Sequence, residues 1–309
     1  MPWLLFVILA SLFYALVSLV DKYVLTNVNI RSSVLVFYIG VLGMLVFLLA
    51  PFVGFAVPSL AAFLLSAGSG FLFSLALFVF FTRLRTFEAS RLVPAVGAFI
   101  PLFIFLFVFI LSGGRETLSG FELAAFLLLI AGTVLISHKK GTSHTRASLQ
   151  AALGSAFLFS LAFVMAKFAY MGQSFWPIFM VMRIGGLAVS LGLLFSQEVR
   201  NELLGKGQRG SGISFWEMPG KYAIFLVGQA SGALGEISRN AALFLVPLAM
   251  LPFVNALQGL QHVFLLVFAA LLSWKFPHIF REEVSRSSLA GKLVAILLIG
   301  GGLALLALR

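Results

Sequence analysis

This chain lacks cysteine altogether, and it is poor in acidic residues and in charge of any kind. Without cysteine there is no disulfide, no thiolate nucleophile and no cysteine-ligated metal or iron–sulfur site. Only 10% of the 309 residues are charged, whereas soluble domains carry about 25%. Asp21 is the single aspartate, so a two-aspartate metal site for prenyl or phosphoryl transfer cannot be built.

Apolar residues fill the chain instead. They make up 61% of the sequence, and the mean hydropathy is +1.11. This leaves too little polar surface to cover a soluble body, so the composition predicts an integral membrane protein with many spans. The opening stretch "MPWLLFVILASLFYALVSLVDK" has no basic start and no small-residue cleavage site, which favours a first span over a signal peptide.

Ten apolar runs are long enough to cross a bilayer as helices of ~20 residues. They are continuous rather than alternating, so we expect an all-α polytopic fold. The expected spans are 3–21, 34–52, 59–82, 92–111, 120–137, 149–171, 176–196, 222–245, 248–273 and 288–308. Turn or charge clusters separate them, such as "PFVGFAVPS" and "QEVRNELLGKGQRGSG".

Lysine and arginine sort sharply between the two sides that these spans define. One side carries 15 of them and the other, where both termini fall, carries only Arg115 and Arg309. The positive-inside rule then predicts a cytoplasmic basic side, with both termini outside the cytoplasm, and we expect the plasma (inner) membrane. The net charge of +11 is thus mainly a topology signal. Nucleic-acid binding is disfavoured because no basic domain exists.

The two halves of the chain resemble each other. "GFELAAFLLLIAGTVLIS" (120–137) matches "AGKLVAILLIGGGLALLA" (290–307), and five spans follow in the same order in each half. This predicts a repeat over 1–138, a cytoplasmic linker over 139–148 and a second repeat over 149–309. Five is odd, so the second repeat is inverted, as in many secondary transporters. An old duplication in a non-transporting protein is the alternative.

The chain resembles the EamA-type family of the drug/metabolite transporter superfamily. The resemblance lies in the five-plus-five layout, in a lysine near the end of the first span of each repeat (Lys22 and Lys167), and in "MVMRIGGLAVSLGLL" with Arg183. The first repeat departs from this pattern, with Tyr38 in the place of Arg183. The resemblance implies a ten-helix exporter or exchanger of small metabolites without an ATPase domain.

Several expected spans carry one polar stripe each, since residues 3, 4 or 7 apart share a helix face. Such groups are costly against lipid, so the stripes should face a common cavity. The candidate solute-binding residues are Arg183, Glu236, Arg239, Lys167, Gln229, Asn255, Gln258, His262, Tyr14, Tyr38 and Trp176.

Some of these residues also have purely structural interpretations. Glu236 and Arg239 can pair on their own helix, Lys167 can extend to the membrane surface, and His262 can be a hydrogen-bonded packing residue. Arg183 has no acid within reach on its helix and needs a partner from another helix or a ligand. The charges of Lys167, Arg183, Arg239 and Glu236 sum to +2, which favours an anionic or zwitterionic solute.

No cofactor, metal ion or ATPase subunit is implied, because the sequence has neither a phosphate-binding G-x-x-x-x-G-K-[ST] motif nor H-E-x-x-H. Exchange or proton coupling remains, with Glu236 as the proton-coupling candidate and Asp21 as the second choice. We therefore expect a secondary-active transporter of a small metabolite rather than an enzyme. A receptor or scaffold of the same fold is the alternative, followed by a membrane-embedded enzyme. The expected partners are the solute and membrane lipid, and the protein could be a monomer or a homodimer.

Overall fold

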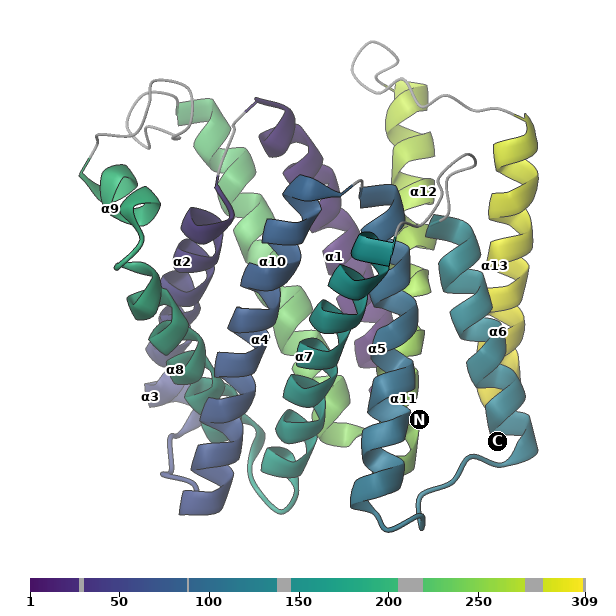
Figure 1. The fold of residues 1–309 in the computed structure, drawn as a ribbon, viewed down its shortest axis with the longest axis horizontal. Helices are drawn as coiled ribbons and strands as arrows, with labels where there is room; N and C mark the ends of the chain where they lie inside the picture. The colour runs from purple at the N-terminus through teal and green to yellow at the C-terminus, as the bar shows by residue number, and fades with distance from the viewer. Residues whose placement is uncertain (28–30, 88, 138–145, 205–218, 276–285, 308–309) are drawn as a thin grey trace.

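The computed structural model describes residues 1–27, 31–87, 89–137, 146–204, 219–275 and 286–307. Most of these residues are helical, and none of them forms a strand. Along the chain the longer helices run back and forth roughly parallel to one another (Figure 1). The predicted 139–148 linker lies largely outside the described residues.

The helices follow the expected order, with additional short elements. The first half contains α1 (Pro2–Asn27), α2 (Ser32–Gly43), η1 (Met44–Leu49), α3 (Ala50–Val53), α4 (Leu60–Thr86), α5 (Ala89–Leu111) and α6 (Gly120–Ser137). The second half contains α7 (Arg146–Tyr170), α8 (Phe175–Leu193), α9 (Gln197–Leu203), α10 (Pro219–Leu245), η2 (Leu248–Met250), α11 (Leu251–Ala256), α12 (Gly259–Lys275) and α13 (Arg286–Ala307).

Five described stretches are long and apolar enough to cross a membrane. They are Ser32–Val53, Leu60–Thr86, Arg146–Tyr170, Phe175–Leu193 and Leu248–Phe268. Four shorter apolar helices accompany them, at Pro2–Ser18, Ala95–Leu111, Gly120–Leu135 and Leu293–Leu306. Helix α10 belongs to neither group, and its sequence carries Lys221, Glu236 and Arg239 among other polar residues. The described part of the chain therefore has helices as its only regular secondary structure, with several candidate membrane spans.

Two expected spans are not single helices. In the span at 34–52, the α-helix ends at Gly43 and the chain continues as the 3₁₀ helix η1. Helix α3 then begins at Ala50, with Pro51 in its first turn, where helices accept proline. The span at 248–273 breaks between α11 and α12. There Thr133 Oγ1 donates to the Ala256 carbonyl oxygen at 3.2 Å. A Cβ added at Gly259 would lie 2.3 Å from Thr133 Oγ1. The break thus lets the chain pass close to α6.

The connection after α8 contains a helix that the charge cluster "QEVRNELLGKGQRGSG" did not suggest. Helix α9 places Val199 against Val34 and Phe37 of α2, forming a small apolar cluster separate from the main core. On the same helix, Glu198 binds Arg31 and Ser33 at the start of α2. This end of the molecule is therefore tied across the two halves by both apolar and polar contacts.

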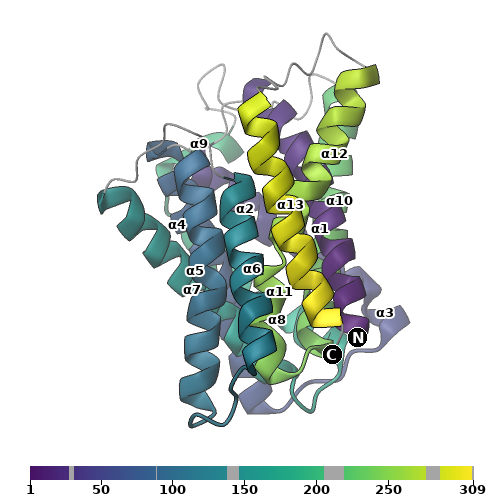
Figure 2. The ribbon, with the colours of Figure 1, turned by 90° about the vertical axis from the view of Figure 1, so that its right-hand side faces the viewer.

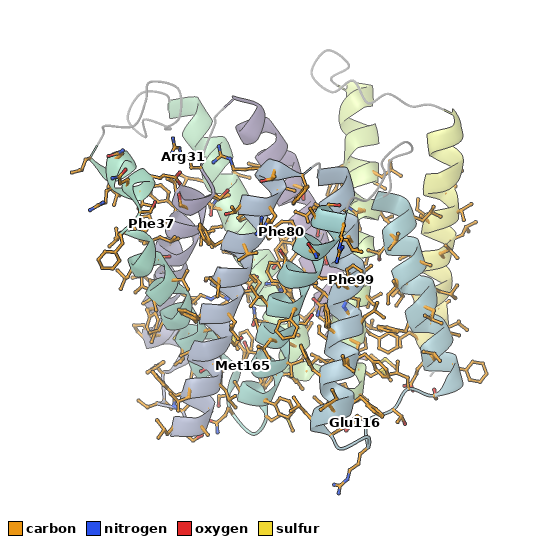
Figure 3. All side chains as sticks on the ribbon, viewed as in Figure 1. Arg31, Phe37, Phe80, Phe99, Glu116 and Met165 are labelled. Carbon is orange, nitrogen blue, oxygen red and sulfur yellow. The ribbon has the colours of Figure 1, made fainter. Side chains whose placement is uncertain are left out.

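The main helix contacts join one half of the chain to the other. Helix α1 packs on α10, α4 on α7 and α8, α5 on α7, and α6 on α13. Figures 1 and 2 both show α1 beginning and α13 ending toward the same end of the bundle. Arg31 and Glu116 mark the two opposite ends (Figure 3).

Glycine allows the closest of these approaches, between α4 and α8. A Cβ added at Gly70 would lie 1.8 Å from the Met182 carbonyl oxygen, and one at Gly185 would lie 1.9 Å from that of Ala67. Neither position tolerates a side chain without separating the helices. The contact therefore fixes α8, which carries Arg183, against the first half of the chain.

Candidate functional site

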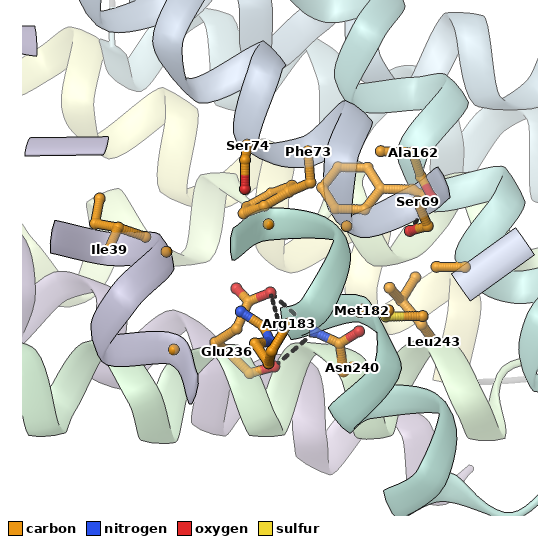
Figure 4. A pocket seen from close by; sticks show the side chains of 16 residues that line it. Ile39, Ser69, Phe73, Ser74, Ala162, Met182, Arg183, Glu236, Asn240 and Leu243 are labelled. Carbon is orange, nitrogen blue, oxygen red and sulfur yellow. Dashed lines mark hydrogen bonds and ion pairs between the residues drawn. The ribbon is translucent and has the colours of Figure 1, made fainter. Parts of the chain in front are cut away.

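A pocket opens between helices of both halves, and two of the predicted site residues line it. Its walls come from α2 and α4 of the first half and from α7, α8 and α10 of the second. Arg183 and Glu236 supply its charged groups, with Asn240, Ser69 and Ser74 among its polar ones (Figure 4). The volume in which the centre of a water molecule fits is about 30 Å³, enough for roughly two water molecules.

Glu236 lies at the centre of the polar groups. Its Oε1 accepts hydrogen bonds from Arg183 Nη2 and Asn240 Nδ2, both at 3.0 Å. Its Oε2 accepts from Tyr14 Oη at 2.7 Å and from Arg239 Nη2 at 2.5 Å. A carboxylate offers about four acceptor positions, so these donors satisfy it. The glutamate therefore binds both arginines, one on its own helix and one across the pocket. Of the two kinds of partner expected for Arg183, another helix or a ligand, the structure contains the first.

Aromatic rings surround the two guanidinium groups unequally. The Arg239 guanidinium carbon lies 4.8 Å from the ring centres of Phe73 and Phe163 and 5.5 Å from that of Tyr14. The Arg183 guanidinium carbon lies 4.5 Å from the Phe179 ring, one helical turn earlier on α8. Ring faces attract cations, and more strongly away from water. Arg239 is thus enclosed by three helices besides its own.

Local sequence explains how α10 and α1 meet at this cluster. Glu236, Arg239 and Asn240 share one face of α10 because they lie three and four residues apart. On the side toward α1, Gly235 has no side chain, and a Cβ there would lie 3.1 Å from the Tyr14 ring. Gly228 lets Val20 approach in the same way. Small residues on α10 therefore bring the Tyr14 hydroxyl within reach of Glu236.

Asn240 extends the cluster to α7. Its Nδ2 also donates to the Glu236 carbonyl oxygen at 2.9 Å, and its Oδ1 accepts from Tyr170 Oη at 3.2 Å. Tyr170 is buried, and its ring stacks on Phe175. The side-chain polar atoms of Asn240 thus connect the carboxylate to the end of α7.

Lys167 is buried but binds elsewhere. Its Nζ donates to the Phe244 carbonyl at 3.1 Å, in the last turn of α10, where carbonyls have no helical partner. This contact satisfies a helix end, with the lysine charge at the negative end of the helix dipole. The charges that meet directly are therefore Glu236 and two arginines, which sum to +1 rather than the expected +2.

Nine predicted site residues do not line this pocket. Tyr14 and Arg239 contact Glu236 from outside it, and Lys167 binds the end of α10. The other six are Gln229, Asn255, Gln258, His262, Tyr38 and Trp176. Asn255 lies on α11 and His262 on α12, with Gln258 between the two helices. Because of this break, the three residues do not share one continuous helix face. Tyr38 packs against the small apolar cluster of Val34, Phe37 and Val199. Trp176 packs edge-on against Phe175 and Phe179. A role for these six residues in binding stays a prediction.

The structure also adds residues that the sequence did not single out as candidates. Phe73 and Phe163 enclose Arg239, but the chain holds 35 phenylalanines and nothing in their spacing distinguishes these two. Asn240 could have been found from its position four residues after Glu236.

Two buried guanidinium nitrogens remain without hydrogen-bond partners in the described part of the chain, Arg183 Nε and Arg239 Nε. Unpaired buried donors are costly, so they mark places where a ligand or water would be stabilised. Among the described residues, no group of three His, Asp or Glu side chains could hold a metal ion. The chemistry offered by the pocket is therefore cationic hydrogen-bond donation beside one carboxylate.

Comparison with known proteins adds information on the fold alone. No family model and no curated protein matches the chain. A solved structure described as "Crystal structure of protein" is similar with a TM-score of 0.69 and 18% sequence identity, over 99% of this chain and 96% of that chain. At this identity the likeness shows that the two chains share a fold over nearly their whole length.

Proposed function

We propose that this protein is a secondary-active transporter, an exporter or exchanger, of a small metabolite that carries an anionic group, either as an anion or as a zwitterion. The observation that carries the proposal is the Arg183–Glu236–Arg239 cluster beside a pocket whose walls come from both halves. Charged groups in the interior of a membrane protein are costly and usually belong to a solute pathway.

The helix contacts support the ten-span arrangement with two inverted repeats that forms part of this proposal. Exchanging the first half for the second turns the α1–α10 contact into α7–α4, and the α5–α7 contact into α12–α1, and all four occur. The α6–α13 and α2–α8 contacts convert into themselves. We extend the proposal to the EamA-type family and to a plasma-membrane location with both termini outside the cytoplasm.

The bonding of Glu236 bears on energy coupling. Arg183, Arg239, Tyr14 and Asn240 all donate to the carboxylate, so a protonated Glu236 would present a donor to a ring of donors. This arrangement favours solute exchange over a proton-carrier role for Glu236. Transport by Glu236→Gln should then change in rate but keep the wild-type pH profile, and a lost pH dependence would restore the proton-carrier hypothesis.

A non-transporting receptor or scaffold is the second candidate. The small free space favours it, because about 30 Å³ admits water but no metabolite in this conformation. Transporters also pass through closed conformations, so flux separates the two functions. We expect proteoliposomes to accumulate at least one labelled compound from a panel of carboxylates, phosphates and zwitterions above protein-free vesicles. Binding without flux for every compound would favour the receptor.

A further inference from the structure

The two arginines lie differently with respect to the pocket, although their side chains are almost equally exposed, at 17% for Arg183 and 19% for Arg239. Arg183 and Glu236 line the pocket, whereas Arg239 is not among its lining residues. Arg239 instead lies among the faces of Phe73, Phe163 and Tyr14. A solute in the pocket therefore meets the Arg183 guanidinium first.

The firmest restraints on Arg239 come from its own helix and from α1, which packs along α10. Arg239 pairs with Glu236 three residues away on the same helix, so the pair persists when α10 moves as a unit. Its rings belong to α1, α4 and α7, and α1 packs along α10 while α4 packs along α7. Arg239 is thereby fixed to the carboxylate on its own helix and to the Tyr14 ring on α1.

Arg183 is held far less. Its contact with Glu236 reaches from α8 to α10, two helices that meet over only a small area. Glycines instead pack α8 against α4 and α2, where Gly70 and Gly40 face it. The Nε of each arginine is buried and has no hydrogen-bond partner among the described residues. Of the two arginines only Arg183 lines the pocket, so its donors are the ones within reach of a solute there. Losing Arg183 would still leave Glu236 with three donors.

We propose that the two arginines have different roles, and this inference rests on the proposed transport function. Arg183 binds the anionic group of the solute and exchanges Glu236 for it. Arg239 is a positioning residue that holds Glu236 in place without touching the solute. Solute binding then releases the link between α8 and α10, which couples occupancy of the pocket to the relative position of helices from the second half.

Matched lysine substitutions at the two positions test this division. The purified full-length variants Arg183→Lys, Arg239→Lys and the control Arg115→Ala are unfolded thermally in detergent, first without added ligand. They are then titrated with acetate, succinate, glycine or inorganic phosphate at constant ionic strength. The shift in unfolding temperature with concentration gives an apparent Kd for each compound.

We expect Arg183→Lys to weaken the apparent affinity for the responding anion by about 10- to 100-fold, since lysine cannot replace the planar fork of arginine. It should also change the preference between carboxylate and phosphate. Arg239→Lys should lower the ligand-free unfolding temperature more than Arg183→Lys does, yet bind the anion within about 3-fold of wild type. Arg115→Ala should match wild type in both measurements.

Two outcomes overturn these assignments in distinguishable ways. If wild type responds but Arg239→Lys loses affinity or preference as much as Arg183→Lys, the division of roles is wrong while solute binding stands. If wild type responds to no compound, the proposed function fails together with the role of Arg183. The ligand-free comparison still tests the positioning role, because an Arg239→Lys variant as stable as Arg183→Lys contradicts it.

Discussion

Glu236 and Glu198 bind the same kinds of group in two different regions of the molecule. Each accepts from arginine and from a hydroxyl, Tyr14 for Glu236 and Ser33 for Glu198. The side chain of Glu236 is 16% exposed in the interior, whereas that of Glu198 is 38% exposed at the end of the bundle. Similar contacts therefore have different energetic consequences, because water and salt screen only the outer pair.

The difference also concerns what each carboxylate connects. Glu198 bonds to Arg31 at 2.6 Å and joins α9 to α2, with apolar packing by Val199 alongside. Glu236 connects α1, α8 and α10 around a pocket, and little besides it joins α8 to α10. An exposed ion pair supported by packing can be lost cheaply, but an interior carboxylate between two arginines cannot.

The largest expected effect is that of Glu236→Gln. It leaves Arg183 and Arg239 facing each other in the interior without a counter-charge, which should cost about 3–5 kcal/mol of stability. Tryptophan-monitored thermal unfolding in detergent measures it, with Glu116→Gln at the far end of the bundle as the control. Equal unfolding temperatures for the two variants would show that the interior cluster is not structurally important.

Intermediate losses of stability are expected when the hydroxyl group that donates to each carboxylate is removed. Tyr14→Phe deletes a hydrogen bond to a charged group in the interior and should cost about 1.5–3 kcal/mol. Ser33→Ala deletes the corresponding bond to Glu198, which solvent can replace, and should cost about 0.5–1 kcal/mol. The same unfolding assay compares them. A larger loss for Ser33→Ala would reverse the account of the two regions.

The smallest effect is expected from Glu198 and should depend on pH. The Ser33 hydrogen bond, and after it the Arg31 guanidinium, lower the pKa of Glu198, while partial burial opposes them. A lowered folded-state pKa gives stability that is present above the unfolded value of about 4.3 and lost as pH falls through the folded value. Wild type and Glu198→Gln should therefore differ slightly at neutral pH and converge in acid. High salt should also reduce the difference, and a gap that widened in acid would contradict this sign.

Composition and helical periodicity predicted the helical membrane character and the central part of the site. The apolar runs correspond to helices, and 120–137 coincides with α6. The spacing on α10 and the lack of an acid near Arg183 pointed to a contact between helices, which the structure contains. Such features follow from local sequence, because a buried charge without a partner on its own helix must pair with a group from elsewhere.

The rest depends on packing that local sequence does not specify. The break before Gly259 reflects the approach of Thr133 from a distant segment, so Gln258 and His262 could not be placed by periodicity alone. Lys167 bonds to the Phe244 carbonyl because the last turn of α7 lies beside the last turn of α10. The rings around Arg239 come from three helices and are chosen by tertiary structure from many equivalent phenylalanines.

Solute flux through the Arg183 variant tests the central claim most directly. Proteoliposomes holding wild type, Arg183→Ala or Arg115→Ala are loaded with the compound that wild type accumulates best, and exchange against the labelled form is followed. The account predicts rapid exchange by wild type and Arg115→Ala, and a loss of about 10-fold or more with Arg183→Ala at subsaturating solute. Exchange by Arg183→Ala at the wild-type rate would contradict it.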